Sequence, residues 1–247
     1  MADSLIKVAH RGASGSYPEN TRIAFEKALE AGVDMIQMDC QLSKDGHVVV
    51  FHDERLQRLA GVKGTVKGRT LQQLKKLDLG VTFKKSLRGQ RIMTLEETMS
   101  LLAGKVDLAI DIKVPPRAPL GIELKILFIL SYYRYLSRSI ISSADYRTLA
   151  RVRELAPQAR IGVNYGKASQ EDPIQVASRL GAGSLHVEKS RVAPNLIGQA
   201  GDLGLKTFVW TVNEVTEMEN FFSMGVDGII SDFPERFWKI KLKKTRR

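Results

Sequence analysis

Short apolar segments alternate with amphipathic segments along the whole chain, and this alternation restricts the choice of fold most strongly. The apolar segments recur at 5–9, 34–39, 106–111, 139–142, 160–164, 184–187, 206–210 and 227–231. Segments with helical periodicity lie between them, such as 21–32, where Gly32 can end the helix. This pattern is typical of strand–helix units built around a parallel sheet.

Eight such strands in 247 residues predict an α/β fold of the (β/α)8 barrel type. A doubly wound open sheet is the alternative, but no glycine-rich dinucleotide fingerprint and no phosphate loop follows a strand. One more strand, at 47–51, follows Lys44-Asp45-Gly46 so closely that these three residues indicate a hairpin turn.

The segment after this hairpin, about 53–90, contains five glycines with basic residues between them and indicates a small insertion carrying one short helix at 70–77. We therefore expect one barrel domain over 1–238, followed by a basic tail at 239–247. The apolar and aromatic stretch 126–138 indicates an outer helix packed on the barrel, with a membrane-facing patch as the alternative.

The net charge of +11 is concentrated at the C-terminus. Six basic residues lie in 239–247, which leaves 32 basic against 27 acidic side chains, or +5, for the rest of the chain. No segment interleaves aromatic with basic residues, and one cysteine cannot build a Cys/His zinc site, so we expect no nucleic-acid partner. We expect a solvated tail, with peripheral contact with an anionic membrane as the alternative.

The single cysteine, Cys40, cannot form an internal disulfide, and the N-terminal segment does not resemble a secretory signal. No run approaches the 18 or so apolar residues that a membrane-spanning helix needs. We therefore expect an intracellular, cytoplasmic protein.

Polar residues cluster where the predicted strands end, and in barrels of this kind the loops after the strands build the active site. Side-chain alternation along a strand sends Gln37 with Asp39, and Asp111 with Lys113, to the same side. We expect one mouth to collect the strand-end residues His10, Arg11, Gln37, Asp39, His52, Asp53, Asp111, Lys113, Trp210 and Asn213. For the two other histidines, His47 and His186, we expect structural roles.

Short motifs in a fixed order identify a family resemblance over residues 6–235. They are HRGASGSYPENTRIAFEKALEAGVDMIQMD, DGHVVVFHD, GRTLQQLKKLDLG, IMTLEE, LAIDIK, IISSAD, VWTVN and GVDGIISDFPE. Together they resemble the glycerophosphodiester phosphodiesterase family. The resemblance implies a (β/α)8 barrel that hydrolyses glycerophosphodiesters to glycerol 3-phosphate and an alcohol, with one divalent metal, Mg²⁺ or Ca²⁺, and two histidines.

The resemblance also implies a role for each matching position. His10 and His52 match the catalytic histidines, Arg11 matches the phosphate-binding arginine, and Lys113 matches a lysine beside a metal ligand. Asp39 matches a metal ligand, while Gln37 and Asp111 stand where the family usually has glutamate ligands. We therefore predict His10 and His52 for catalysis, Arg11, Lys113 and Trp210 for substrate binding, and Gln37, Asp39 and Asp111 for metal.

The residue types suit the chemistry, because a phosphodiester needs an acid, a base and cations near its non-bridging oxygens. Histidine serves both proton roles near neutral pH, and carboxylate and amide oxygens suit a hard cation. Because Gln37 removes one charge, a catalytically impaired barrel that binds phosphodiesters or polyanions is one alternative. Lysophospholipase D activity on longer lipids is another, and Glu188 is a further candidate acid.

Two residues near the predicted site have alternative roles. Glu19 and Asn20 can cap the first helix, with Asn20 or Thr21 as the N-cap, or can brace Arg11. Asp232 is expected to shape the loop before Pro234. Trp210 is as compatible with the barrel core as with a wall of the substrate pocket.

Overall fold

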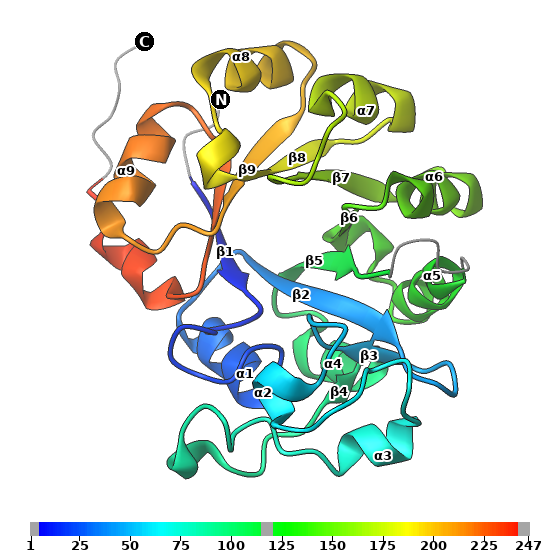
Figure 1. Cartoon of the computed structure of the whole chain (residues 1–247). Coiled ribbons are helices and arrows are strands. Elements are labelled where there is room, and N and C mark those ends of the chain that lie inside the picture. Colours follow the sequence, from blue (N-terminus) through cyan, green and yellow to red (C-terminus); the bar gives the residue numbers. More distant parts are fainter. Residues whose placement is uncertain (1–4, 115–120, 242–247) are drawn as a thin grey trace.

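The computed structural model describes residues 5–114 and 121–241 and shows a closed ring of eight parallel strands (Figure 1). These strands are β1 (Ile6–His10), β2 (Met35–Leu42), β5 (Asp107–Ile112), β6 (Ser139–Ser143), β7 (Arg160–Tyr165), β8 (Ser184–Glu188), β9 (Lys206–Trp210) and β10 (Gly228–Ser231). The ring closes because β1 pairs with both β2 and β10. The predicted (β/α)8 barrel is confirmed, and the open doubly wound sheet is excluded.

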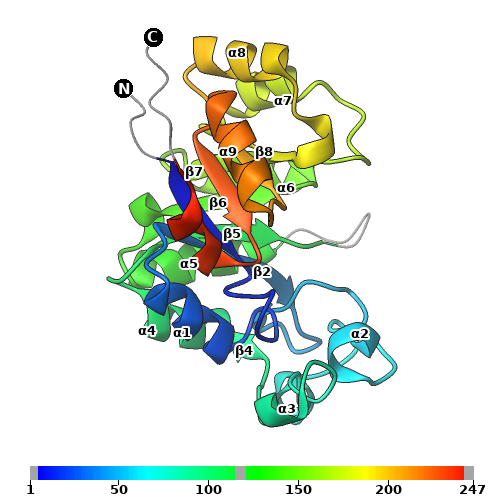
Figure 2. The same ribbon diagram turned by 90° about the vertical axis from the view of Figure 1, so that its left-hand side faces the viewer.

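Helices surround the ring on the outside (Figures 1 and 2). They are α1 (Arg22–Glu30), α4 (Leu95–Leu102), α5 (Ile122–Tyr132), α6 (Tyr146–Leu155), α7 (Pro173–Leu180), α8 (Pro194–Asp202) and α9 (Val215–Ser223). Short 3-10 helices are η1 (Lys85–Leu87), η2 (Leu136–Arg138), η3 (Lys189–Arg191) and η4 (Pro234–Lys239). The largest apolar cluster lies between the strands and these helices, as two-layer packing requires.

A smaller apolar cluster fills the interior of the barrel. It consists of Val8, Met35, Ala109, Ile140, Phe208 and Ile230. Phe208 packs so closely on β10 that a Cβ atom at Gly228 would lie 2.5 Å from its ring, so this position requires glycine. The barrel is therefore a packed core and opens only at its ends.

The strand register brings polar residues from different strands side by side. His10 on β1 pairs with Gln37 on β2, and Asp39 on β2 pairs with Asp111 on β5. Because these positions lie at the carboxyl ends of parallel strands, their side chains share one rim of the barrel. The register thus brings four site residues together, and the segments after β1, β3 and β5 add Arg11, His52 and Lys113.

The hairpin after β2 carries the insertion. Strand β3 (Val48–Val50) runs antiparallel to β2, and β4 (Met93–Thr94) pairs with β3. Between them lie α2 (Gln57–Ala60) and α3 (Leu71–Lys75). The expected single helix at 70–77 is present as α3, but the expectation of only one helix was wrong, because α2 is too short to show a helical period.

The insertion has an apolar cluster of its own, separate from the main core. Its buried members are Val49, Phe51, Leu56, Leu59, Val66, Leu74, Leu79 and Ile92. Thr70 begins α3 with a reciprocal capping box to Gln73. This cluster fixes the insertion beside the carboxyl end of β2 (Figure 2).

The final described element, η4, runs to Lys239 and packs on the barrel through the buried Phe237. Nε1 of the exposed Trp238 donates to the backbone oxygen of Ala31 at 2.6 Å. Of the predicted basic tail, residues 242–247 lie outside the described residues. Within the described part of the chain, every helix is too short or too polar to cross a membrane.

Candidate active site

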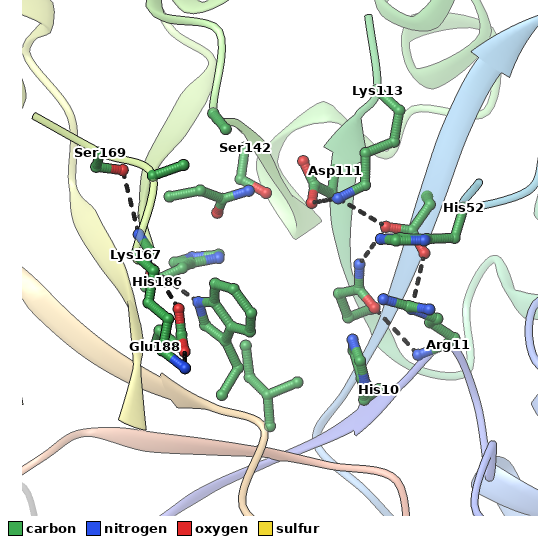
Figure 3. A pocket seen from close by; sticks show the side chains of 18 residues that line it. His10, Arg11, His52, Asp111, Lys113, Ser142, Lys167, Ser169, His186 and Glu188 are labelled. Carbon is green, nitrogen blue, oxygen red and sulfur yellow. Dashed lines mark hydrogen bonds and ion pairs between the residues drawn. The ribbon is translucent and has the colours of Figure 1, made fainter. Parts of the chain in front are cut away.

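A cavity of about 340 Å³ opens at the carboxyl ends of the barrel strands (Figure 3). All eight residues expected to form the catalytic, substrate and metal sites line it: His10, Arg11, Gln37, Asp39, His52, Asp111, Lys113 and Trp210. Asn213 lies beside the cavity rather than in its wall, where it donates to Asp232 at 2.8 Å. His186 also lines the cavity, but it is buried, and this burial lowers its pKa to about 4.

The loop after β1 turns sharply to present Arg11. Arg11 has φ 57° and Gly12 has φ 83°, so two consecutive residues adopt the left-handed region. Gly12 packs on α1, where a Cβ atom would lie 2.6 Å from the backbone carbon of Ala24. The turn therefore requires glycine at position 12, and it places the Arg11 guanidinium beside Asp39 with Nε at 3.2 Å from Oδ2.

Each of the two candidate catalytic histidines is held by a carboxylate. Nδ1 of His10 lies 2.6 Å from Oδ1 of Asp232, and Nδ1 of His52 lies 2.7 Å from Oδ1 of Asp53. No described residue hydrogen-bonds to Nε2 of His10 or of His52. A carboxylate at Nδ1 fixes the orientation of the ring and its tautomer, which leaves Nε2 for a ligand in the cavity.

The charges around the histidines favour the ionised form of their carboxylate partners, Asp232 and Asp53. Burial opposes ionisation of Asp232, but the hydrogen bond and charge of His10 outweigh it and lower the pKa of Asp232 to about 2. Burial likewise opposes ionisation of Asp53, yet its pKa falls to about 2 because Arg58 and His52 hydrogen-bond to it. Burial lowers the pKa of His52, although the charge of Asp39 works in the opposite direction.

Asp39 and Asp111 form a buried pair of carboxylates bridged by a lysine. Nζ of Lys113 lies 2.6 Å from Oδ2 of Asp111 and 3.4 Å from Oδ1 of Asp39. Burial opposes ionisation of Asp39, but the charges of Lys113 and Arg11 outweigh it and lower the pKa of Asp39. Burial and the charge of Asp39 raise the pKa of Asp111.

Gln37 connects this pair to the loop after β1. Its side-chain oxygen accepts from the backbone N–H of Arg11 at 3.0 Å, and its amide nitrogen donates to Oδ1 of Asp39 at 3.2 Å. Asn20 donates to Oδ2 of Asp39 at 3.0 Å. Asn20 therefore holds the carboxylate and does not cap α1. Thr21 occupies the N-cap position without a side-chain cap, and Glu19 braces Arg11 at 2.8 Å.

The acids nearest Gln37 fit a hard cation. Asp39, Asp111 and Gln37 all line the same cavity, and Oδ1 of Asp111 is buried without a hydrogen-bond partner among the described residues. An unpartnered buried carboxylate oxygen is costly unless a cation or a polar ligand meets it. Gln37, Asp39 and Asp111 thus remain a chemically suitable donor set for Mg²⁺ or Ca²⁺.

A second group of possible ligands consists of Glu19, His52 and Asp53, whose ligand atoms lie within 4.8 Å of one another. The Arg58 guanidinium already hydrogen-bonds to both carboxylates of this group, at 2.6 to 2.8 Å. All four carboxylate oxygens of Glu19 and Asp53 therefore already accept hydrogen bonds. In the first donor set, Oδ1 of Asp111 has no such partner among the described residues, although Lys113 bridges the two acids. This difference favours the first donor set.

The opposite wall of the cavity is formed by β7, β8 and β9. Glu188 accepts from the backbone N–H of Lys167 at 2.9 Å and lies 3.4 Å from its Nζ atom. Figure 3 shows these two residues across the cavity from Asp111, Lys113 and His52. Glu188 therefore does not join Asp39 and Asp111 as the replacement acid that the sequence suggested.

Asp53 and Asp232 were missed as partners of the histidines. Asp53 directly follows His52 in the sequence, and this adjacency is a usable signal. Asp232 lies 222 positions from His10, and only the closure of the ring by β1 and β10 brings them together. Asp232 does shape the loop, as expected, but it also contacts a cavity residue.

Comparison with known proteins gives consistent matches over nearly the whole chain. The model of the glycerophosphoryl diester phosphodiesterase family matches residues 10–236. A glycerophosphodiester phosphodiesterase of Caldanaerobacter subterraneus is 41% identical over 230 residues, covering 92% of this chain and 94% of that protein. A putative glycerophosphodiester phosphodiesterase of Bacillus subtilis is 37% identical over 232 residues, covering 92% and 94%.

Solved structures of phosphodiesterases also match nearly the whole chain. A phosphodiesterase of Oleispira antarctica, in complex with the product sn-glycerol-3-phosphate, superposes with a TM-score of 0.86 at 25% identity, and the match covers 94% of each chain. A putative glycerophosphoryl diester phosphodiesterase of Silicibacter pomeroyi has a TM-score of 0.87 at 26% identity, covering 96% of this chain and 93% of that one.

The closed barrel, its polar cavity at the strand ends and these matches define an enzyme that hydrolyses phosphoric diesters. The chain belongs to the glycerophosphoryl diester phosphodiesterase family. The resemblance inferred from the sequence motifs is thereby confirmed, as is the prediction that the protein is an enzyme.

Proposed function

We propose that the protein hydrolyses glycerophosphodiesters to glycerol 3-phosphate and an alcohol, with His10 and His52 as the general acid and base. The observation that carries this proposal is that each ring is held at Nδ1 by a carboxylate while both line one cavity. The product complex of the related Oleispira enzyme supports the choice of substrate. Positioned acids and bases contribute most when their ring nitrogens point at the reacting oxygens.

Arg11 and Lys113 are proposed to bind the phosphate. A guanidinium offers a planar fork to the phosphate oxygens, and an ammonium offers a compact charge. Both cations are already held in place by Asp39 and Asp111, so they need little reorganisation when the substrate arrives. Trp210 is proposed to form a wall for the organic part of the substrate, since its Nε1 donates to the backbone oxygen of His186 at 2.9 Å and fixes the ring.

A divalent cation, Mg²⁺ or Ca²⁺, is proposed to bind Asp39, Asp111 and the oxygen of Gln37. The unpartnered Oδ1 atom of Asp111 supports this assignment. An amide oxygen has two lone pairs, so Gln37 can accept from Arg11 and still serve a cation. When bound, the cation supplies Lewis-acid stabilisation of charge on the phosphate.

The test is release of glycerol 3-phosphate from glycerophosphocholine, with and without EDTA. We expect turnover that EDTA abolishes and that added Mg²⁺ or Ca²⁺ restores. Binding of the diester without turnover at any metal concentration would instead support the impaired, phosphodiester-binding barrel. Lysophosphatidylcholine as a second substrate tests the lysophospholipase D alternative, and we expect it to be the poorer substrate of the two.

We further propose a cytoplasmic location and peripheral contact of the basic tail with anionic membranes. The support is the six basic residues in 239–247, each of which contributes about 1 kcal/mol beside an anionic surface. Deletion of these residues should leave hydrolysis of a soluble diester unchanged and weaken binding to phosphatidylserine vesicles at low salt. Equal vesicle binding by both forms would leave the tail as a solvated extension.

A further inference from the structure

Arg58 lies on α2 of the insertion, outside the cavity wall. It nevertheless contacts two carboxylates, Asp53 and Glu19, and each of these holds one side chain of the cavity. Its Nε and Nη2 atoms donate to the Asp53 carboxylate at 2.6 and 2.8 Å. Its Nη1 and Nη2 atoms donate to the Glu19 carboxylate, both at 2.8 Å. One guanidinium thus forms a two-pronged contact with each of two carboxylates.

Each carboxylate leads directly to a residue of the site. Asp53 holds Nδ1 of His52 at 2.7 Å, and Glu19 accepts from Nη1 of Arg11 at 2.8 Å. A single carboxylate therefore separates Arg58 from the proposed catalytic histidine, and another separates it from the proposed phosphate-binding arginine. These two residues come from different parts of the barrel, the loop after β3 and the loop after β1.

The charges make Arg58 necessary for this arrangement. Glu19 and Asp53 lie close enough for their ligand atoms to fall within 4.8 Å, and two carboxylates at that distance repel each other. Burial opposes ionisation of Glu19, but the hydrogen bond from Arg58 and the charges of Arg11 and Arg58 lower its pKa overall. Without Arg58, Glu19 and Asp53 both lose the one cation outside the cavity that pairs with them among the described residues.

The insertion holds Arg58 in place through its own core. Leu56 and Leu59, on either side of Arg58, are buried in the insertion cluster together with Phe51, which directly precedes His52. The insertion cluster therefore connects the backbone of α2 to the backbone that carries His52. The side chain of Arg58 is 48% exposed, so it closes the network from the solvent side.

We propose that Arg58 is a positioning residue that sets His52 and Arg11 relative to each other through Asp53 and Glu19. The insertion thereby acts on the chemistry of the barrel without lining its cavity. This inference rests on the proposed function, because it assigns Arg58 an effect on the proposed acid–base histidine and phosphate ligand.

The experiment compares three variants in hydrolysis of glycerophosphocholine over a range of pH. Arg58→Gln removes the charge and the fork, and Arg58→Lys keeps only the charge. Arg55→Gln is the matched control, because Arg55 lies in the same segment, is exposed and has no side-chain hydrogen bond or ion pair to another described residue. Thermal unfolding of each variant measures stability separately.

For Arg58→Gln we expect kcat/KM to fall by about 10- to 100-fold, the usual effect of removing a group that orients a functional residue, with a rise in KM as Arg11 loses its orientation. The acidic limb of the pH profile should move to higher pH. His52 faces the anions Glu19, Asp39, Asp53 and Asp111 and the cations Arg11 and Lys113, and Arg58 pairs with two of these anions, so loss of the Arg58 charge raises the pKa of His52. Arg58→Lys should fall between Arg58→Gln and the wild type, and Arg55→Gln should match the wild type.

Several outcomes would overturn the inference. One is Arg58→Gln with a lower melting temperature but an unchanged pH profile and kcat/KM. Another is Arg55→Gln with the same loss as Arg58→Gln. If Arg58→Gln does not fold, an Arg58→Lys variant indistinguishable from the wild type in kcat/KM and pH profile also overturns it. Failure of the wild type to hydrolyse the diester contradicts the proposed function itself and is recognised before any variant is compared.

Discussion

The carboxylates at Nδ1 of His10 and His52 make the two rings directly testable. We expect His10→Ala and His52→Ala each to lower kcat by roughly 10² to 10⁴, the usual contribution of a positioned acid or base. Melting temperatures should stay near that of the wild type, because neither ring fills the apolar core. Turnover close to the wild-type value in a folded variant would remove that histidine from the proposed chemistry.

Gln37 allows a second test, on metal affinity. With Asp39 and Asp111 it provides two formal negative charges, and Gln37→Glu adds a third. At an effective dielectric near 20, charges 4 Å apart interact by about 4 kcal/mol, although burial of another carboxylate and repulsion among the acids offset much of this. We expect Gln37→Glu to raise the affinity for Mg²⁺ or Ca²⁺, measured by calorimetry, and to raise activity most at low metal concentration.

The result for Gln37→Glu also discriminates between metal sites. Coincident metal titrations of the two forms would show that Gln37 does not bind the cation. An inactive variant would indicate that the contacts of the amide with Arg11 and Asp39 are themselves required. Asp39→Asn, which removes a proposed ligand outright, is the matched comparison and should weaken metal binding.

The site residues predicted from the sequence came together because strand ends in a barrel converge. Alternation along the strand placed Gln37 beside Asp39, and motif resemblance supplied the histidines. Partners such as Asp232 and Arg58 were not predictable in this way, since their contacts depend on ring closure and on the packing of the insertion. The sequence pattern alone does not indicate which distant carboxylate will hydrogen-bond to which histidine.

The turn from β1 to α1 is sensitive to substitution at Gly12. Gly12→Ala would force an L residue into φ 83° and place its Cβ atom 2.6 Å from the backbone of Ala24. We expect a loss of at least about 2 kcal/mol in the free energy of unfolding, measured by urea denaturation. Gly104→Ala, with φ 83° but open space around it, is the control for the backbone term alone and should cost less.

The eight barrel strands were predictable because each is a buried apolar run between turn signals. Seven of them appear within one residue of their expected limits, and β2 extends three residues beyond its expected end. Helix α2 was not predictable, because four residues span about one turn and show no period. The helical conformation of α2 is stabilised by the packing of Leu56 and Leu59 in the insertion cluster, and this tertiary contact cannot be read from local sequence.

For the molecule as a whole, the depressed pKa of Asp232 predicts acid sensitivity. Its folded pKa is about 2 against an ordinary value of 3.8, so the folded state is stabilised above that ordinary value and loses this contribution as pH falls towards 2. The shift corresponds to about 2 kcal/mol in the free energy of unfolding. Asp232→Asn should therefore be less stable at neutral pH.

Urea denaturation at several pH values checks this prediction. The stability of Asp232→Asn should change less between about pH 4 and pH 2 than the stability of the wild type. Equal slopes for the two proteins in that range would show that Asp232 does not have a depressed pKa in the folded state. Asp34→Asn, at an exposed acid that pairs with Lys7, is the matched control.

The pairing of β1 with β10 has a consequence for how this protein behaves at high concentration. A ring of strands presents no row of unpaired backbone groups to a neighbouring molecule. The branch that leaves the ring at β2 ends on β4, which is only two residues long, so within the described chain it provides little template for strand addition. Fibril-like self-association of the native enzyme should therefore require prior opening of one strand pairing of the ring, such as that of β1 with β10.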